Sequence, residues 1–172
     1  MPLKKISVVF PGQGSQYVGM LDEYLNKELS FKPFFNQASE ILNINLLKLI
    51  KDGSKEELSR TEITQPLMLV ANIALWNLIS NKIETPICLA GHSLGEYAAL
   101  VAAEVISFND SLNLVQIRAK LMQEAVPAGE GGIAAIIGLN EKILNKICKS
   151  ISSQPELLVS PSNLNSENQI VI

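Results

Sequence analysis

The residues best suited to chemistry are Gly91-His92-Ser93-Leu94-Gly95, a G-x-S-x-G pentapeptide. An apolar segment, residues 87–90, precedes it and an Ala-rich segment, residues 96–104, follows it, so the pattern predicts a tight turn between a buried strand and a helix. Such a turn exposes the serine hydroxyl and leaves the Leu94 N–H free to bond a developing oxyanion. We expect Ser93 to be a nucleophile; the alternative is a glycine-rich turn that holds a serine by chance.

A serine nucleophile needs a base that takes its proton. His92 is the only histidine in the chain, and it directly precedes Ser93, where side chains in a sharp turn diverge. We therefore expect His92 to be packed or hydrogen-bonded beneath the turn. The sequence contains no evident base for Ser93.

A second candidate is Arg118, in a segment at residues 109–126 that predicts a helix. At 100° per residue, apolar side chains cluster around the arginine on one face, namely Leu114, Leu121, Met122 and Ala125. A guanidinium in an apolar stripe is costly unless it meets an anion, and its planar fork suits a carboxylate. Arg118 is thus either a receptor for a substrate carboxylate or half of an internal salt bridge, and spacing alone favours neither.

A glycine-rich loop at residues 11–16 follows an apolar segment at residues 5–10. It contains Gly-x-Gly but not the rest of a phosphate-binding fingerprint, which disfavours nucleotide binding. In a parallel sheet this loop leaves the same carboxyl edge as the turn at Ser93, where ligands of α/β folds bind. The backbone N–H of Gln13 is the expected second oxyanion donor; the alternative is a turn with no chemical role.

The elements that would position these groups alternate between short strands and helices. We expect strands at residues 5–10 and 87–90, and helices at 19–30, 33–50, 54–60, 64–80, 96–104 and 109–126. Pro66 would lie in the first turn of its helix, and Asn109 or Asp110 would cap the last of these helices. After a break at 129–132 we expect a strand at 133–139, a helix at 140–152, a strand at 156–160, a polar loop at 160–168 and a strand from Gln169. This order predicts a first domain over residues 1–127 and part of an α+β subdomain over residues 128–172.

Composition narrows the class of protein. The chain has 172 residues, of which 47% are apolar and 18% charged, and this favours a packed core over disorder. A net charge of −3 argues against a nucleic-acid partner. Cys88 and Cys148 lie far apart without a histidine cluster, so neither a disulfide framework nor a metal site is expected. We see no apolar run long enough for a membrane span or signal peptide, and we expect a cytoplasmic protein with no membrane partner.

Together these segments closely resemble the malonyl-CoA:acyl carrier protein transacylase family. The matching stretches, in the family's order, are Phe10-Pro11-Gly12-Gln13-Gly14-Ser15-Gln16, Thr64-Gln65-Pro66, Gly91-His92-Ser93-Leu94-Gly95-Glu96, residues 116–123 and residues 168–172. The resemblance implies an α/β fold, with a hydrolase-like parallel-sheet core and an inserted ferredoxin-like subdomain that begins near residue 128. Family members are longer, so both parts would be incomplete, and the family's histidine base would lie beyond the last residue of this chain.

The resemblance also implies roles for individual residues. Ser93 would attack the thioester of malonyl-CoA, and the resulting malonyl-serine would pass its acyl group to the thiol of acyl carrier protein in fatty-acid synthesis. The N–H groups of Gln13 and Leu94 would form the oxyanion hole. Arg118 would bind the free malonyl carboxylate, and Gln65 and Met122 would line the pocket. No cofactor is implied, because coenzyme A is part of the substrate.

Two other functions remain open from the sequence. In the first alternative, the chain would be a non-catalytic truncated remnant, or a half that needs a second chain to supply strands and a histidine. The apolar end at residues 170–172 favours this alternative, since it would form an unprotected edge strand. A small serine esterase would keep the turn at Ser93 but would leave Arg118 without a role.

Overall fold

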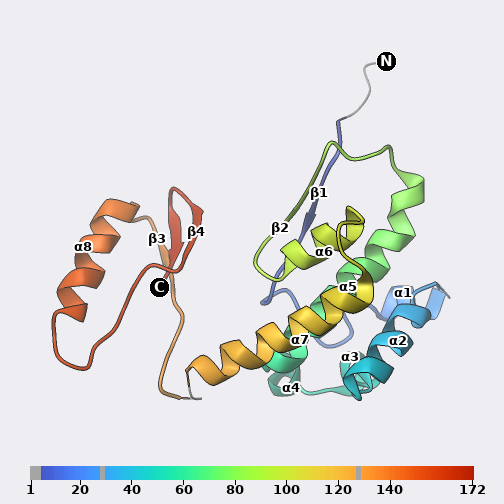
Figure 1. The fold of residues 1–172 in the computed structure, drawn as a ribbon, viewed down its shortest axis with the longest axis horizontal. Coiled ribbons are helices and arrows are strands. Elements are labelled where there is room, and N and C mark those ends of the chain that lie inside the picture. The colour runs from blue at the N-terminus through green and yellow to red at the C-terminus, as the bar shows by residue number, and fades with distance from the viewer. Residues whose placement is uncertain (1–4, 28–29, 127–128) are drawn as a thin grey trace. The chain divides into compact units, whose positions relative to one another are not determined.

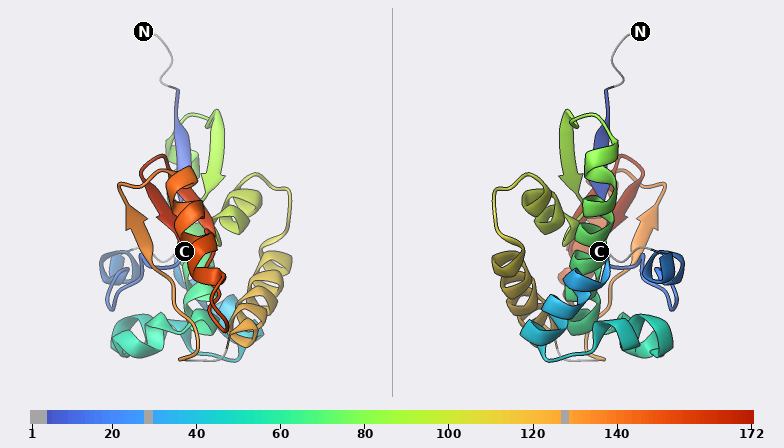
Figure 2. Two further views of the ribbon diagram at one scale, coloured as in Figure 1. Left: turned by 90° about the vertical axis from the view of Figure 1, so that its left-hand side faces the viewer. Right: turned by 90° about the vertical axis from the view of Figure 1, so that its right-hand side faces the viewer.

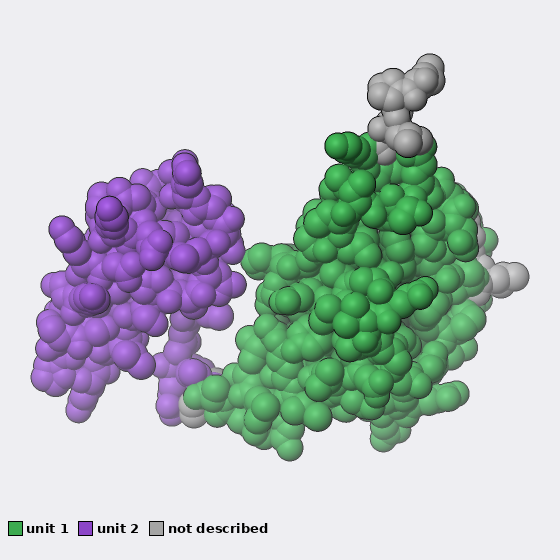
Figure 3. All heavy atoms as spheres, turned by 45° about the horizontal axis from the view of Figure 1, so that its top comes forward, with its two compact units in different colours: residues 1–125 green, residues 126–172 purple. Residues whose placement is uncertain are grey.

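The computed structural model describes residues 5–27, 30–126 and 129–172. The chain divides into two compact units, residues 1–125 and 126–172 (Figure 3). The domain boundary expected between residues 127 and 128 lies outside the described residues. Each unit has its own buried core, so each is described by itself.

The first unit contains the expected parallel sheet. Strand β1 (Ser7–Phe10) pairs in parallel with β2 (Cys88–Gly91), in a register that places Phe10 opposite Gly91. Val8 and Phe10 pack into the core on one face of this sheet, whereas Val9, on the other face, is exposed. Because the strands run in parallel, the loop after β1 and the turn after β2 leave the same edge (Figure 1).

Four short helices follow β1 in the sequence, before a long helix and strand β2. They are α1 (Asp22–Lys27), α2 (Lys32–Leu42), α3 (Leu46–Asp52) and α4 (Lys55–Ser59). The single helix expected at residues 33–50 was wrong, because Asn43 adopts the left-handed conformation, with φ 54°, and ends α2. The side chain of Asn45 then accepts a hydrogen bond from the Lys48 N–H and starts α3. Ser54 and Glu57 form a capping box on α4.

Helix α5 (Thr61–Ile79) is the central helix of the first unit and continues into a 3-10 turn, η1 (Ser80–Lys82). It begins earlier than expected, because the N–H groups of Ile63 and Thr64 already donate to the Arg60 carbonyl. Pro66 therefore lies inside the helix and not in its first turn. By length and composition alone the stretch Thr61–Lys82 is apolar enough to cross a membrane, contrary to expectation, but 61% of its most apolar window is buried, as in the core helix of a globular protein.

Two further helices complete the first unit: α6 (Gly95–Ala102), which packs on the sheet, and α7 (Phe108–Ala125), which packs along α5 (Figures 1 and 2). The cap of α7 is Ser107, whose hydroxyl accepts from the Asp110 N–H at 3.0 Å, and not Asn109 or Asp110. The predicted buried face of α7 was also wrong. Small and medium side chains pack against the rest of the unit, namely Ser111, Leu112, Val115 and Ala119, whereas Leu114, Leu121, Met122 and Ala125 are exposed.

The second unit is a three-stranded antiparallel sheet with one helix. Its elements are β3 (Ala135–Ile137), α8 (Glu141–Ser152), β4 (Asn163–Ser166) and β5 (Gln169–Val171), and the strand order is β3-β5-β4. The unprotected edge strand expected at residues 170–172 was wrong, because β5 lies between β3 and β4 and pairs with both. Residues 156–160 do not form the expected strand, and the stretch expected to be a polar loop contains β4. The sequence of β4 is largely polar, so hydrophobic periodicity does not predict a strand there. The strand forms because it pairs with β5.

Candidate active site

The turn between β2 and α6 has the geometry of a nucleophile elbow. Ser93 has φ +54°, in the left-handed region that a residue with a Cβ rarely adopts, and it is exposed. A Cβ on Gly91 would lie 2.0 Å from the Gly95 carbonyl carbon, and a Cβ on Gly95 would lie 2.2 Å from the Phe10 carbonyl oxygen. Strand and helix can approach this closely only because both positions are glycine.

The two backbone N–H groups expected to bond an oxyanion belong to Leu94, in this turn, and to Gln13, in the loop after β1. Leu94 immediately precedes α6, and its side chain is fully buried, which fixes the peptide at the positive end of the helix. The Leu94 and Gln13 N–H groups make no hydrogen bond within the described residues. A Cβ on Gly12 would lie 2.6 Å from the His92 carbonyl oxygen, so the loop after β1 runs directly against the elbow.

Arg118 links the remaining predicted site residues into one hydrogen-bonded chain. Its Nη2 donates to the Ser93 hydroxyl at 3.1 Å. Its Nη1 donates to Oε1 of the buried Gln65 at 2.5 Å. The Gln65 Nε2 in turn donates to the sulfur of Met122 at 3.3 Å, which keeps Oε1 turned toward the guanidinium. The structure thus brings together Ser93, Arg118, Gln65 and Met122, from the elbow, α7 and α5.

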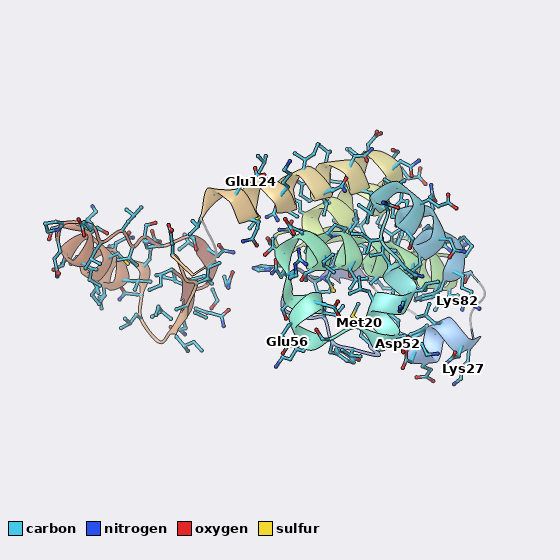
Figure 4. The ribbon with its side chains drawn as sticks, turned by 90° about the horizontal axis from the view of Figure 1, so that it is seen from below. Met20, Lys27, Asp52, Glu56, Lys82 and Glu124 are labelled. Carbon is cyan, nitrogen blue, oxygen red and sulfur yellow. The ribbon has the colours of Figure 1, made fainter. Side chains whose placement is uncertain are left out.

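Arg118 has no carboxylate partner within the described residues. The ion pairs there are Lys27–Glu23, Arg60–Glu62 and Lys120–Glu124, and all six side chains are exposed. Figure 4 labels one member of each of two pairs, Lys27 and Glu124. The half-buried guanidinium instead bonds to two neutral oxygens. Binding of an anion to a guanidinium held in this way is favourable, because charge-assisted hydrogen bonds are stronger than hydrogen bonds to neutral acceptors. The geometry favours an anion receptor over an internal salt bridge.

His92 is not packed in the core beneath the turn, because the residue is exposed. Its backbone holds the elbow together: its N–H donates to the Phe10 carbonyl at 3.0 Å, and its carbonyl accepts from the Gly95 N–H at 2.9 Å. The ring Nδ1 lies on the Gly12 side, 3.3 Å from where a Gly12 Cβ would be. That His92 does not serve as the base for Ser93 stays a prediction.

Two residues that contact the site were not predicted from the sequence, and both belong to α5. The Thr61 hydroxyl accepts from the Gln13 side chain at 3.3 Å, and the Asn72 side chain donates to the Pro11 carbonyl at 3.0 Å. A signal was present: Thr61, Gln65 and Asn72 are polar, and at 100° per residue they share one face of the helix. In the part of the chain that the structure describes, no group of three potential metal-ligating side chains is found.

Residues 8–172 match the family model described as the acyl transferase domain. The chain is 46% identical over 171 residues to malonyl CoA-acyl carrier protein transacylase of Salmonella typhimurium, covering 99% of this chain and 55% of that protein. The Bacillus subtilis protein of that name is 43% identical over 170 residues, covering 99% of this chain and 53% of that protein. The chain thus spans about half the length of these relatives.

Solved structures agree with these relationships. The malonyl CoA-acyl carrier protein transacylase of Coxiella burnetii superposes with a TM-score of 0.92 at 43% identity, covering 98% of this chain and 53% of that one. A malonyl-transacylase solved in complex with a type II polyketide acyl-carrier protein gives a TM-score of 0.90 at 43% identity, with coverages of 98% and 54%. The α/β fold is therefore shared with these enzymes. Since the family model matches nearly the whole sequence, the chain belongs to the acyl transferase domain family.

Proposed function

We propose that this chain carries the nucleophile and the carboxylate receptor of a malonyl-CoA:acyl carrier protein transacylase of fatty-acid synthesis. The observation that carries the proposal is the contact between Arg118 Nη2 and Ser93 Oγ, 3.1 Å apart. In a malonyl thioester one methylene separates the carboxylate carbon from the thioester carbonyl carbon, so the two carbons lie about 2.5 Å apart. A guanidinium beside the nucleophile therefore suits a short diacid, whose reacting carbonyl it would bring to Ser93.

Acyl transfer would proceed in two steps, acylation of Ser93 and transfer of the acyl group to the carrier-protein thiol. The Ser93 Oγ attacks the thioester carbonyl carbon, the carbonyl electrons move to oxygen, and the N–H groups of Gln13 and Leu94 bond that oxyanion. Collapse breaks the carbon–sulfur bond, and coenzyme A leaves as a thiol with the proton from Ser93. The carrier-protein thiol then attacks malonyl-serine and returns a proton to Ser93. By the family resemblance, the base that moves these protons is a histidine in the part of the relatives that this chain does not span.

The receptor is held in place before substrate arrives. Gln65 accepts from Nη1 of Arg118, and Met122 fixes the Gln65 amide from the other side. A malonyl carboxylate would replace the Ser93 hydroxyl at Nη2, and this exchange would free the serine oxygen to attack the carbonyl. Preorganisation of this kind lowers the cost of binding and orienting the substrate.

We also propose the finer fold of the family for the two units. The parallel β1–β2 pair with its elbow supports a hydrolase-like core. The order β3-β5-β4 supports a ferredoxin-like subdomain, since β5 lies between two strands that are joined through α8, which is the split βαβ arrangement. Both would be incomplete in this chain. We expect a cytoplasmic protein whose partners are malonyl-CoA and acyl carrier protein, with no further cofactor, metal, nucleic acid or membrane.

The test is the intact mass of the protein after incubation with malonyl-CoA. We expect a slow gain of one malonyl group, because a missing triad base lowers the rate by several orders of magnitude. Ser93→Ala should abolish the adduct, and Arg118→Ala should reduce it on the order of 100-fold, whereas Lys120→Ala, on an exposed face of the same helix, should not change it. Wild type without any adduct would remove the activity from this chain alone.

One observation favours a second candidate, a half that associates with another chain. Several large apolar side chains of the first unit are exposed, namely Val9 on the uncovered sheet face and Leu114, Ile117 and Leu121 on α7. A monodisperse monomer that melts cooperatively would contradict this candidate. The esterase alternative predicts hydrolysis of neutral esters that is insensitive to Arg118→Ala.

A further inference from the structure

The buried stretch of α5 contains a polar residue to which the proposed chemistry gives no role. All residues from Thr64 to Ala74 are buried, and the polar ones among them are Thr64, Gln65 and Asn72. The Thr64 hydroxyl bonds to the carbonyls of Leu58 in α4 and of Arg60 just before α5, and Gln65 bonds to Arg118. Asn72 is 3% exposed and donates across 61 positions of sequence to the Pro11 carbonyl.

Asn72 shares its face of α5 with the other two site contacts. At 100° per residue, Thr61, Gln65 and Asn72 fall within about 40° of one another. Each holds a different part of the site: Thr61 contacts the Gln13 side chain, Gln65 contacts Arg118, and Asn72 contacts Pro11. Burying an amide in an apolar helix costs free energy unless it is hydrogen-bonded, so the Pro11 carbonyl is what makes Asn72 tolerable there.

The Pro11 carbonyl controls the direction of the Gln13 N–H. Its peptide plane is rigid, and only Gly12 separates it from the peptide plane that carries the Gln13 N–H. Two soft dihedral angles, both of a glycine, therefore set the direction of that donor, and glycine restricts them less than any other residue. An anchor on the Pro11 plane removes much of this freedom, and the contact of Gly12 with the His92 carbonyl removes more.

We propose that Asn72 is a positioning residue that aims the Gln13 N–H at the oxyanion. The inference rests on the proposed function, in which Gln13 supplies one of two oxyanion donors. An oxyanion donor contributes to rate only if it is already directed at the developing charge. Loss of the Asn72 bond should therefore lower the rate of acylation of Ser93 without weakening the binding of the thioester.

The experiment compares two substitutions with a matched control. Asn72→Leu removes the donor with an apolar side chain that has the same number of heavy atoms and the same branching, and Asn72→Asp keeps the shape but places an acceptor against the Pro11 carbonyl. The control is Ser111→Ala, because Ser111 is also fully buried in a core helix and its hydroxyl has no partner within the described residues. Two variants keep the test decisive if one of them fails to fold, which circular dichroism would report.

The first measurement is ¹⁵N NMR relaxation of the backbone amides at residues 12–14, because the Gln13 N–H makes no hydrogen bond within the described residues that amide exchange could report. In both Asn72 variants the order parameter of the Gln13 N–H should fall from a rigid value of about 0.85 to below about 0.6, while wild type and Ser111→Ala keep the rigid value and α7 is unchanged. An equal order parameter in all four proteins overturns the proposal. This measurement needs no substrate, so it decides the role of Asn72 even where malonyl-CoA fails to acylate the wild type and the proposed function fails.

The second measurement separates rate from binding. With malonyl-CoA, the maximal acylation rate of Asn72→Leu should fall 10- to 100-fold, while the dissociation constant stays within twofold. A parallel weakening of binding would indicate general damage to the site and would overturn the proposal. An unchanged maximal rate in a variant whose Gln13 N–H has become mobile would also overturn it.

Discussion

At the residue scale, the site depends on how one guanidinium divides its donors. Arg118 gives one N–H to a buried amide and another to an exposed serine hydroxyl. The amide of Gln65 cannot rotate without losing its contact to Met122, so it offers Arg118 an oxygen without adding a negative charge. A neutral acceptor orients the guanidinium and leaves its charge available for a ligand. This is why glutamine suits the position better than glutamate.

Gln65→Glu tests this division directly. The new carboxylate would form a half-buried ion pair with Arg118 and would compete with the malonyl carboxylate for the guanidinium. We expect acylation by malonyl-CoA to fall on the order of 100-fold, while the free energy of unfolding, measured in urea, drops by less than about 1 kcal/mol. Gln65→Leu should cost more stability, about 1.5–3 kcal/mol, because it leaves a hydrogen bond to a charged group unmade. Full malonyl acylation in Gln65→Glu would contradict a receptor role for Arg118.

At the scale of elements, the site exists because a strand, a helix and a loop approach within van der Waals distance. Gly91 and Gly95 allow β2 and α6 to meet, and Gly95 also touches the end of β1. The left-handed Ser93 is held between them by hydrogen bonds of the His92 backbone to Phe10 and Gly95. The strained residue is therefore supported on both sides, as expected where strain persists in a folded protein.

Gly95→Ala should break this contact. Its Cβ would meet the Phe10 carbonyl oxygen at 2.2 Å, a backbone atom that cannot rotate away. We expect a loss of about 3 kcal/mol or more in the free energy of unfolding, measured by denaturant titration. The matched control is Gly132→Ala, since nothing lies within 4 Å of the new Cβ and Gly132 is not in the left-handed region. Equal stability of the two variants would contradict the close approach.

Local signals predicted most of the elements that carry the site. The strands β1 and β2 and the helix α6 follow from short apolar or Ala-rich runs, and Pro11-Gly12, Gly91 and Gly95 mark the boundaries beside the site. The break between α2 and α3 was missed, because a helix was expected over all of residues 33–50 although Asn43 and Asn45 are residues that favour a helix end and a helix start. The buried face of α7 was wrong because both faces carry apolar residues, and only packing against α5 decides between them.

Prediction of the site was limited in the same way, because contacts between residues far apart in the sequence cannot be identified from the sequence alone. Ser93 and Arg118 were predicted from the residue pattern, Gln65 and Met122 only from the family resemblance, and the structure joins all four by hydrogen bonds. Asn72 was missed because nothing in a single polar residue of an apolar helix identifies a carbonyl 61 positions away as its partner. Its shared face with Gln65 was the one available clue.

At the scale of the whole molecule, the two units have very different cores. The first unit buries a large cluster that includes Phe31, Phe35, Leu67 and Leu69. Among the described residues of the second unit, the buried core consists of Leu144, Cys148 and Ile170, with partly buried neighbours. Small cores supply little stability beyond the cost of ordering the chain. We therefore expect the second unit to open far more often than the first.

Two buried leucines test this difference in the full chain. Leu144→Ala removes a core side chain of the second unit and Leu69→Ala one of the first, and each substitution typically costs about 2–5 kcal/mol. Because the cores are separate, Leu144→Ala should abolish slow hydrogen exchange in α8 and leave that of α5 unchanged. Leu69→Ala should accelerate hydrogen exchange in α5 without abolishing its protection, since a similar loss of stability is a smaller fraction of what the larger core provides. If Leu144→Ala accelerates exchange in α5 as much as in α8, the chain unfolds as one cooperative body, and the residues proposed to bind the acyl group, on α5 and α7, then depend on the second unit for their order.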